Sequence, residues 1–527
     1  LPENRSLVYE ILKLAEDVPD LVRDLVVENS EGNPFYVEEL IKMLIDQGAI
    51  IKGQESWKIL PENLAELSVP PTLAGILQAR LDTLTPMQKS VLQQASVIGR
   101  LFWNKALFYL NDYGTESVDH ALIEEALTEL RSRELIFKRN RSTFSLATEY
   151  TFNHTILREV AYESVLLRNR GPYHGLTADW LREHSGERSV EMVALTADHL
   201  IRADRSTEAV ADLYLAGQQA AARFANEEAI AYLTRALELA PITDISTRFQ
   251  LLSEREKASH MLGSRGRQKA DLEVLQELAT SLGAVEMASV SLRLASFEEA
   301  KSNYEAMIVA ARNAIAFVTE DGPAEILSRG HLEWGTALER LGRYQRAHEQ
   351  LEQALDLAFT AGDGTLAGSS LRGLGIVARA MGRHQDSYLY YEDALAQFIE
   401  LNDVSAQTST LIWLGVLSTD MGDVARARAY YEEALELTRR TGFRYQESFA
   451  LSNLGSNANY LGDYGRATSF IEQALEVARE IENRIVECLC LNNLGTVSLN
   501  RGDFESSFLN YEQSMAIAMD TGHRRME

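Results

Sequence analysis

Cysteine is almost absent from this sequence: its 527 residues include only Cys488 and Cys490. Two thiols cannot cross-link a chain of this length, which excludes a disulfide-rich secreted protein and fits a reducing compartment. No apolar run reaches the length of about 18 residues that a membrane span needs, and nothing resembles a signal peptide. These absences predict a soluble, cytoplasmic protein that does not bind membranes.

Positive charge is scarce as well. The chain has 51 Lys and Arg against 77 Asp and Glu, a formal charge of −26. Such a balance repels nucleic acid and anionic lipid, so we expect neither as a partner. Only 10 residues are proline, and 46% are hydrophobic, which excludes general disorder. The length suggests about three or four domains or a repeat array.

The phosphate-binding motif G-x-x-x-x-G-K-[ST] is missing, and no Gly-Lys pair occurs anywhere. Without that loop and its lysine, the chain cannot hydrolyse ATP alone. We also find no motif for catalytic residues or for a metal site. The sequence begins Leu1-Pro2 without a methionine, so we expect it to be a piece of a longer protein.

Glycine recurs with a period of 40 residues in the second half of the chain. It stands at 335, 375, 415, 455 and 495, and again seven residues later at 342, 382, 422, 462 and 502. Small and apolar residues follow at helical spacing, so each period predicts a helix hairpin. The first glycine lets the two helices approach closely, and the second suits a left-handed turn residue.

Small residues complete each period where neighbouring helices have to pack. They are Ala347, Ala354, Ala394, Ala427, Ala434, Ala467 and Ala474, with Ser387, Ser507 and Ser514 at equivalent positions. The pattern resembles the tetratricopeptide repeat in a 40-residue form, which implies an α-solenoid. Five regular repeats fill residues 324–527, and degenerate repeats, one around Gly217, fill 189–323. "HRRME" at 523–527 has the register of "FRYQE" at 443–447, which predicts that the chain ends inside a further repeat.

The first part of the chain has a different organisation. Breaking residues at 32–34 precede a helix predicted from Phe35 to Gln47, and Thr85-Pro86 is a helix start. Further helices are predicted over 72–83, 86–97, 116–133 and 154–167, with two short strands around 135–140 and 149–153. Helices followed by a β-hairpin and another helix suggest a winged helix. The sparse positive charge on its predicted wing does not favour DNA binding.

A second resemblance covers this region. "EGNPFYVEELIKMLIDQGAI", "VPPTLAGILQARLDTLTPMQKSVLQQASVIGRLF" and "YTFNHTILREVAYESVLLRNR" occur in this order before the repeats. Together they resemble the lid and winged-helix parts of STAND-type signal-transduction ATPases, as linked in bacteria to adenylate or guanylate cyclase domains or to LuxR-type helices. The resemblance implies a helical lid remnant over 1–69 and a winged-helix arm over 70–188. The fold class that we predict is therefore mainly α, a winged-helix domain followed by an α-solenoid.

The STAND resemblance also implies a nucleotide site. In that family a Gly-x-Pro loop lies against adenine and a winged-helix histidine approaches the phosphates, which here are Gly32, Asn33, Pro34 and His154. ADP or ATP is thereby implied for the parent protein, although this chain alone needs no cofactor. The alternative is that His154 caps its helix or packs beneath the wing.

The repeats offer a second candidate site. In such superhelices the first helix of each hairpin lines an inner groove, where amide, arginine and tryptophan side chains can hold a peptide. A solvated face without a ligand is the alternative. The inward positions are Arg340, Arg372, Arg379, Trp413, Asn453, Asn459, Asn492, Asn493 and Asn500.

The function that these patterns favour is regulatory. We expect a sensor region of a multidomain signalling NTPase that binds a protein or peptide in the groove and controls an upstream ATPase core; oligomerisation on activation stays open. Two alternatives remain: a scaffold without nucleotide control, and the regulatory part of a nucleotide cyclase whose catalytic domain lies upstream.

Overall fold

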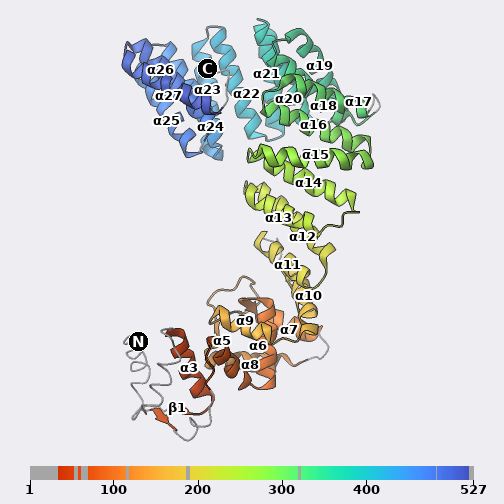
Figure 1. The fold of residues 1–527 in the computed structure, drawn as a ribbon. Helices are drawn as coiled ribbons and strands as arrows, with labels where there is room; N and C mark the ends of the chain where they lie inside the picture. The colour runs from red at the N-terminus through yellow and green to blue at the C-terminus, as the bar shows by residue number, and fades with distance from the viewer. Residues whose placement is uncertain are drawn as a thin grey trace. The chain divides into compact units, whose positions relative to one another are not determined.

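The computed structural model describes residues 34–52, 57–60, 69–113, 118–184, 190–318, 322–481 and 483–521. These residues are mainly α-helical, as the sequence predicted. The chain divides into two compact units between Gly263 and Ser264, and each unit is described by itself (Figure 1). No helix in the described ranges combines the length and the apolar character that a membrane crossing requires.

The first unit begins with a helix and a β-hairpin. Helix α3 starts at Pro34, which fits because proline at the first helical position loses no hydrogen bond. Its apolar face packs with Ile76 of the following helix in a small core of buried side chains. The elements are α3 (Pro34–Asp46), the antiparallel strands β1 (Ile50–Lys52) and β2 (Trp57–Ile59), and α5 (Leu73–Asp82).

Four helices and a three-stranded antiparallel sheet follow. The strand order is β3-β5-β4, so the last strand lies between the other two. A continuous core joins the helices to the sheet through side chains such as Phe102, Leu127 and Phe152. The elements are α6 (Pro86–Ile98), β3 (Leu101–Trp103), α7 (Asn104–Asp112), α8 (His120–Ser132), β4 (Ile136–Lys138), β5 (Glu149–Phe152) and α9 (Thr155–Glu163).

The structure confirms some sequence predictions here and corrects others. Thr85 caps α6 in a reciprocal capping box with Gln88. Strand β3 and helix α7 were not predicted, because the aromatic-rich stretch that contains them is too short to show a clear period. The helix predicted over 154–167 is wrong at its end: α9 stops at Glu163, and a separate helix begins at Leu167.

Helices packed in sequence complete the first unit. Each contacts the next, from α10 to α14. In the pair α12 and α13, a Cβ atom on Gly217 would lie 2.7 Å from Leu233, so only glycine allows this approach. The helices are α10 (Leu167–His184), α11 (Val190–Arg202), α12 (Ser206–Ala222), α13 (Asn226–Leu239) and α14 (Ile245–Met261).

The second unit is a stack of helix hairpins (Figure 1). It opens with α15 (Arg265–Leu282), α16 (Ala284–Ala300) and α17 (Tyr304–Val318). The five regular hairpins follow at the predicted period. They are α18 (Ala324–Arg340) with α19 (Tyr344–Ala361), α20 (Gly364–Ala380) with α21 (His384–Glu400), α22 (Val404–Asp420) with α23 (Val424–Thr441), α24 (Arg444–Tyr460) with α25 (Tyr464–Glu480), and α26 (Arg484–Arg501) with α27 (Phe504–Thr521).

The two glycines of each period act as predicted. A Cβ atom on Gly375 would lie 2.5 Å from the Tyr391 ring of the paired helix, and Gly455 faces Ile471 in the same way. Gly462 has a φ of 76°, in the left-handed region where glycine carries no steric penalty. Close helix contact and the turn therefore depend on separate glycines.

Buried small residues join the helices of each hairpin. The predicted alanines, such as Ala394 and Ala474, are fully buried. Where serine replaces alanine, its hydroxyl finds a partner, because Ser387 donates to the Gly375 carbonyl at 2.7 Å and Ser507 to the Gly495 carbonyl at 2.9 Å. Both cysteines are buried, as expected of small packing residues.

Candidate functional site

The first helices of neighbouring repeats lie side by side. Helices α18, α20, α22, α24 and α26 each contact the next one in this series, and their exposed side forms what we call the first-helix face. Its cross-repeat contacts join residues 41 apart, as in Arg379 to Asp420 at 2.7 Å and Asn493 to the Ser452 hydroxyl at 2.9 Å. The residues predicted to line the groove lie on this face.

Asparagine dominates the face at α24 and α26. Asn500 donates to the Asn459 side chain at 3.2 Å, and Asn453 donates to the Phe449 carbonyl at 2.9 Å. In the part of the chain that the structure describes, the side chain of Asn492 has no hydrogen-bond partner. The amide side chains therefore form a polar strip in which only some of the hydrogen-bonding groups have partners. The bonded side chains fix the positions of their neighbours.

Two arginines on helix α20 of the same face each lie against an aromatic ring. The Arg379 guanidinium lies 5.5 Å from the Trp413 ring centroid, and the Arg372 guanidinium lies 5.6 Å from that of Phe398. These distances allow cation–π attraction. Arg340, also predicted for this face, is exposed and has Glu339 at 3.4 Å.

One residue of the face escaped the sequence analysis. Glu333 holds the position that Gly373, Trp413, Asn453 and Asn493 hold in the four following repeats. Burial, and then the charge of Glu299, raises the pKa of Glu333 to about 7. The repeat register would have identified this position, but nothing in the sequence shows that its carboxyl group is buried.

The predicted nucleotide residues divide between described and undescribed parts. Gly32 and Asn33 lie outside the described residues, and Pro34 begins α3. His154 precedes α9, yet its side chain does not cap that helix. Its ring packs edge-on against Phe35, with 5.3 Å between the centroids. The start of α3 and His154 therefore lie in one corner of the first unit.

Buried charges surround this corner. The His154 Nε2 atom is 3.7 Å from a Glu39 oxygen and makes no hydrogen bond. Glu39 forms a buried ion pair with Arg80, which also contacts Asp46 at 2.8 Å. Because Glu39 pairs with both Arg80 and Lys42, it neutralises positive charge that a phosphate group would use.

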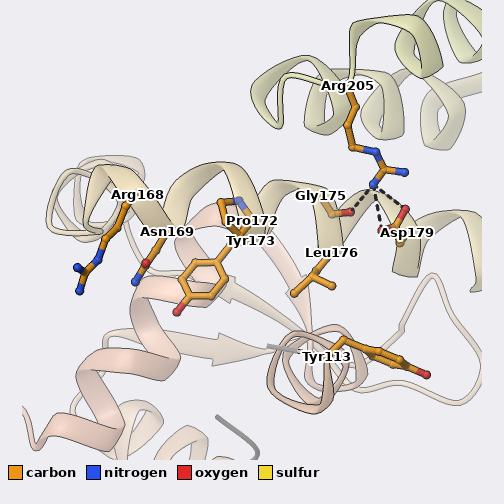
Figure 2. A pocket seen from close by; sticks show the side chains of 9 residues that line it. All are labelled: Tyr113, Arg168, Asn169, Pro172, Tyr173, Gly175, Leu176, Asp179 and Arg205. Atoms are coloured by element: carbon orange, nitrogen blue, oxygen red, sulfur yellow. Dashed lines mark hydrogen bonds and ion pairs between the residues drawn. The ribbon is translucent and has the colours of Figure 1, made fainter. Parts of the chain in front are cut away.

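A separate depression of about 750 Å³ lies along α10. Figure 2 shows Tyr113, Tyr173 and Leu176 around it, and Arg205 reaching from the start of α12 to Asp179. The Arg205 guanidinium lies 2.8 Å from Asp179 and donates to Glu208 at 2.6 Å. This arginine therefore ties α10 to α12, and none of the predicted site residues lines the depression.

A family model for the tetratricopeptide repeat matches residues 324–400, 407–480 and 446–520. These segments are tetratricopeptide repeats. The match agrees with the observed hairpin boundaries and with the 40-residue period, so the first-helix face belongs to a repeat array.

Two other comparisons concern a solved structure and a related sequence. A solved STAND protein with a tetratricopeptide repeat sensor from Pyrococcus horikoshii aligns over the whole of this chain and 74% of its own, with 12% identity and a TM-score of 0.54. That similarity is one of fold. An uncharacterized protein from Rhizobium meliloti (strain 1021) is 26% identical over 228 residues, which are 42% of this chain and 20% of that protein. The matched region thus spans about a fifth of this relative.

Proposed function

We propose that this chain is the regulatory and sensor region of a multidomain signalling NTPase, in which the repeats bind a protein or peptide. The observation that carries the proposal is the first-helix face. It places asparagine side chains, tryptophan and arginine on adjacent helices of tetratricopeptide repeats. Amides supply donors and acceptors to an extended backbone, and arginine and aromatic side chains supply anchors.

The first unit is proposed to connect the repeats to an upstream ATPase core. Helices α6, α7 and α8 with a sheet of order β3-β5-β4 support a winged-helix arm. The fold similarity to a STAND protein over the whole chain supports the same assignment. Pro34 and His154, which lie in one corner with Phe35 between them, are proposed to face ADP or ATP held by that core.

The proposed mechanism is a shift between two states. Ligand binding on the repeats changes nucleotide control only if the ligand has different affinities for the closed and open forms of the parent protein. The arm would transmit this difference because α10 and α11 pack against each other and join it to the first repeats.

A peptide-display selection on the 527-residue chain tests the binding proposal. We expect linear peptides whose affinity falls about tenfold or more in Asn453→Ala and Asn493→Ala, because each loses amide contacts to the peptide backbone. Glu433→Gln on the exposed side of α23 is the matched control and leaves the affinity unchanged. Selected peptides that bind both asparagine variants as tightly as the wild type would contradict the proposal.

Nucleotide control needs a separate experiment on the full-length natural protein. Denaturation of the purified protein releases any bound ADP for measurement by chromatography. We expect His154→Ala to retain less ADP than the wild type, with His120→Ala as the exposed control. Peptide binding without any released ADP would favour a scaffold that has no nucleotide control.

A further inference from the structure

Helix α10 has an unusual sequence for a helix interior. Gly171, Pro172 and Gly175 all lie inside it, although glycine and proline are the two least favourable residues there. A Cβ atom on Gly171 would contact no neighbouring element within 4 Å, and one on Gly175 would lie 3.7 Å from Ala203. Close packing therefore does not explain these glycines. Their effect is to keep side-chain bulk away from this part of the helix.

The missing bulk leaves the depression of about 750 Å³ along α10 (Figure 2). Its wall is one face of the helix, because Asn169, Tyr173 and Leu176 follow one another at helical spacing. The opposite face of α10 packs into the core of the first unit through Trp180 and Leu181. The volume lies in the range of about 300–1,000 Å³ that small-molecule sites occupy.

The depression offers an aromatic and aliphatic contact surface. Tyr173 and Leu176 belong to α10, and Tyr113 follows the end of α7 on the other side (Figure 2). Tyr113 is 67% exposed, so its ring is available to a ligand. Aromatic rings on two elements favour a ligand that is itself aromatic, because ring pairs gain energy beyond the area that they bury.

The polar groups of the depression differ in whether they have partners. Arg205 is ion-paired with Asp179 and Glu208, so its charge is already matched. The side chains of Arg168 and Asn169, by contrast, make no hydrogen bond or ion pair with any residue in the described part of the chain. Both lie at the end of the depression away from Arg205 (Figure 2). Their N–H groups are donors that match an acidic group on a ligand.

From this geometry we propose that the depression along α10 binds a small aromatic acid. The aromatic body lies against Tyr113, Tyr173 and Leu176, and the acidic group accepts hydrogen bonds from Arg168 and Asn169. The site belongs to the first unit and shares no residue with the first-helix face, so it does not depend on peptide binding by the repeats. Because α10 packs against α6, α7 and α11, the bound acid stabilises the helix that connects the sheet to the first repeats.

Isothermal titration calorimetry of the 527-residue chain tests the site with 2-naphthoate as the probe. The compound 2-naphthamide is the neutral isostere, and acetate lacks the aromatic body. At constant ionic strength, we expect 2-naphthoate to bind at a single site and about tenfold or more tightly than either control compound.

Two variants remove the two kinds of contact separately. The side chains of Arg168 and Tyr113 are both exposed, so Arg168→Gln and Tyr113→Ala should keep the thermal midpoint of the free wild type. Each should weaken 2-naphthoate binding about tenfold, and only Arg168→Gln should abolish the preference over 2-naphthamide. Arg141→Gln, which alters an exposed arginine between β4 and β5, changes the net charge equally and keeps the wild-type affinity.

Three results would overturn the site. They are equal binding of 2-naphthoate and 2-naphthamide, an unchanged affinity in both Arg168→Gln and Tyr113→Ala, and no binding of 2-naphthoate to the wild type at millimolar concentration. An equal loss in Arg141→Gln would also count against it, because net charge would then account for the binding. None of these results bears on peptide binding by the asparagine variants, so the two proposals can fail independently.

Discussion

His174 Nδ1 lies 2.8 Å from His199 Nδ1, and this contact fixes the tautomers of both rings. His199 Nε2 must donate to the Ile98 carbonyl at 3.1 Å, so its Nδ1 atom accepts. His174 then donates from Nδ1 and accepts the Tyr162 hydroxyl at Nε2, at 3.0 Å. The chain of bonds joins α6, α9, α10 and α11, and two neutral imidazoles satisfy it.

Acid should therefore destabilise the first unit. Burial lowers the pKa of His174 to about 3 and that of His199 to about 4. Below pH ~6.5 the unfolded state binds protons that the folded state excludes, so stability falls from about pH 6.5 down to about pH 4. We expect a loss of about 3–4 kcal/mol between pH 7 and pH 5, measured by urea unfolding with Trp103 and Trp180 fluorescence.

Controls identify this part of the pH dependence. The double variant His174→Gln and His199→Gln should lose the part of the pH dependence of stability that the two imidazoles cause. The variant His120→Gln, whose ring is exposed beside Asp112, should keep it. An unchanged slope in the double variant would show that other groups account for the acid sensitivity.

The close approach at Gly455 can be tested with one methyl group. Gly455→Ala places a Cβ atom against Ile471 and should destabilise the second unit by about 1–3 kcal/mol, because overpacking outweighs the helix preference of alanine. Gly465→Ala on α25 is the control, since its nearest neighbour would be Asp463 at 3.8 Å, and it should stabilise by about 0.5–1 kcal/mol. Urea unfolding followed by circular dichroism measures both. Equal effects of the two variants would contradict the packing role of Gly455.

A buried carboxylate holds the loop between β4 and β5. Glu149 accepts hydrogen bonds from Trp103, Arg139 and Thr143, at 2.7–3.1 Å. Burial opposes its ionisation, but these bonds prevail and hold the pKa of Glu149 below its ordinary value. Its contribution to stability is present above about pH 4.5 and is lost as the pH falls through the lower folded value.

Glu149→Gln should therefore cost about 2–3 kcal/mol at pH 7, with a change in Trp103 fluorescence. The difference from the wild type should shrink below pH ~4, because the wild-type carboxyl is then protonated too. A constant difference across that range would mean that the charge of Glu149 contributes nothing.

The ion pair between Glu39 and Arg80 joins α3 to α5, and both side chains are 2% exposed. Arg80→Met leaves the Glu39 carboxylate buried with less compensation and should cost about 3–5 kcal/mol. Adding Glu39→Leu should recover part of the loss, since an apolar pair replaces the stranded charge. Additive losses in urea unfolding would show that the two residues act independently.

Periodic features were predictable from the sequence. The glycine and alanine positions repeat every 40 residues, so one interpretation explained five hairpins at once. In the degenerate segment the same reasoning does not fix which side of a helix is buried: on α15, Leu272 and Leu275 are buried, whereas Ala270 and Val274 are exposed. Without the glycine signature, the helix phase could not be fixed.

The candidate site was predictable only in outline. The repeat register places Arg372, Arg379 and Trp413 on the first helices, and the structure shows them there. It could not reveal that Arg379 lies against the Trp413 ring and pairs with Asp420, because these contacts depend on side-chain conformations in two neighbouring repeats. The contact between His154 and Phe35 joins segments that are far apart in the chain, and no local pattern predicts it.

The spacing of the cross-repeat bonds bears on how such a protein can change over generations. Arg379 with Asp420, Ser452 with Asn493, and Asn459 with Asn500 are each 41 residues apart. Duplication or loss of one whole period at the gene level keeps every such pair in phase and changes only the length of the face. A deletion of a few codons changes the spacing of the pairs that span it and breaks those contacts, so natural variants should differ mainly by multiples of 40 residues.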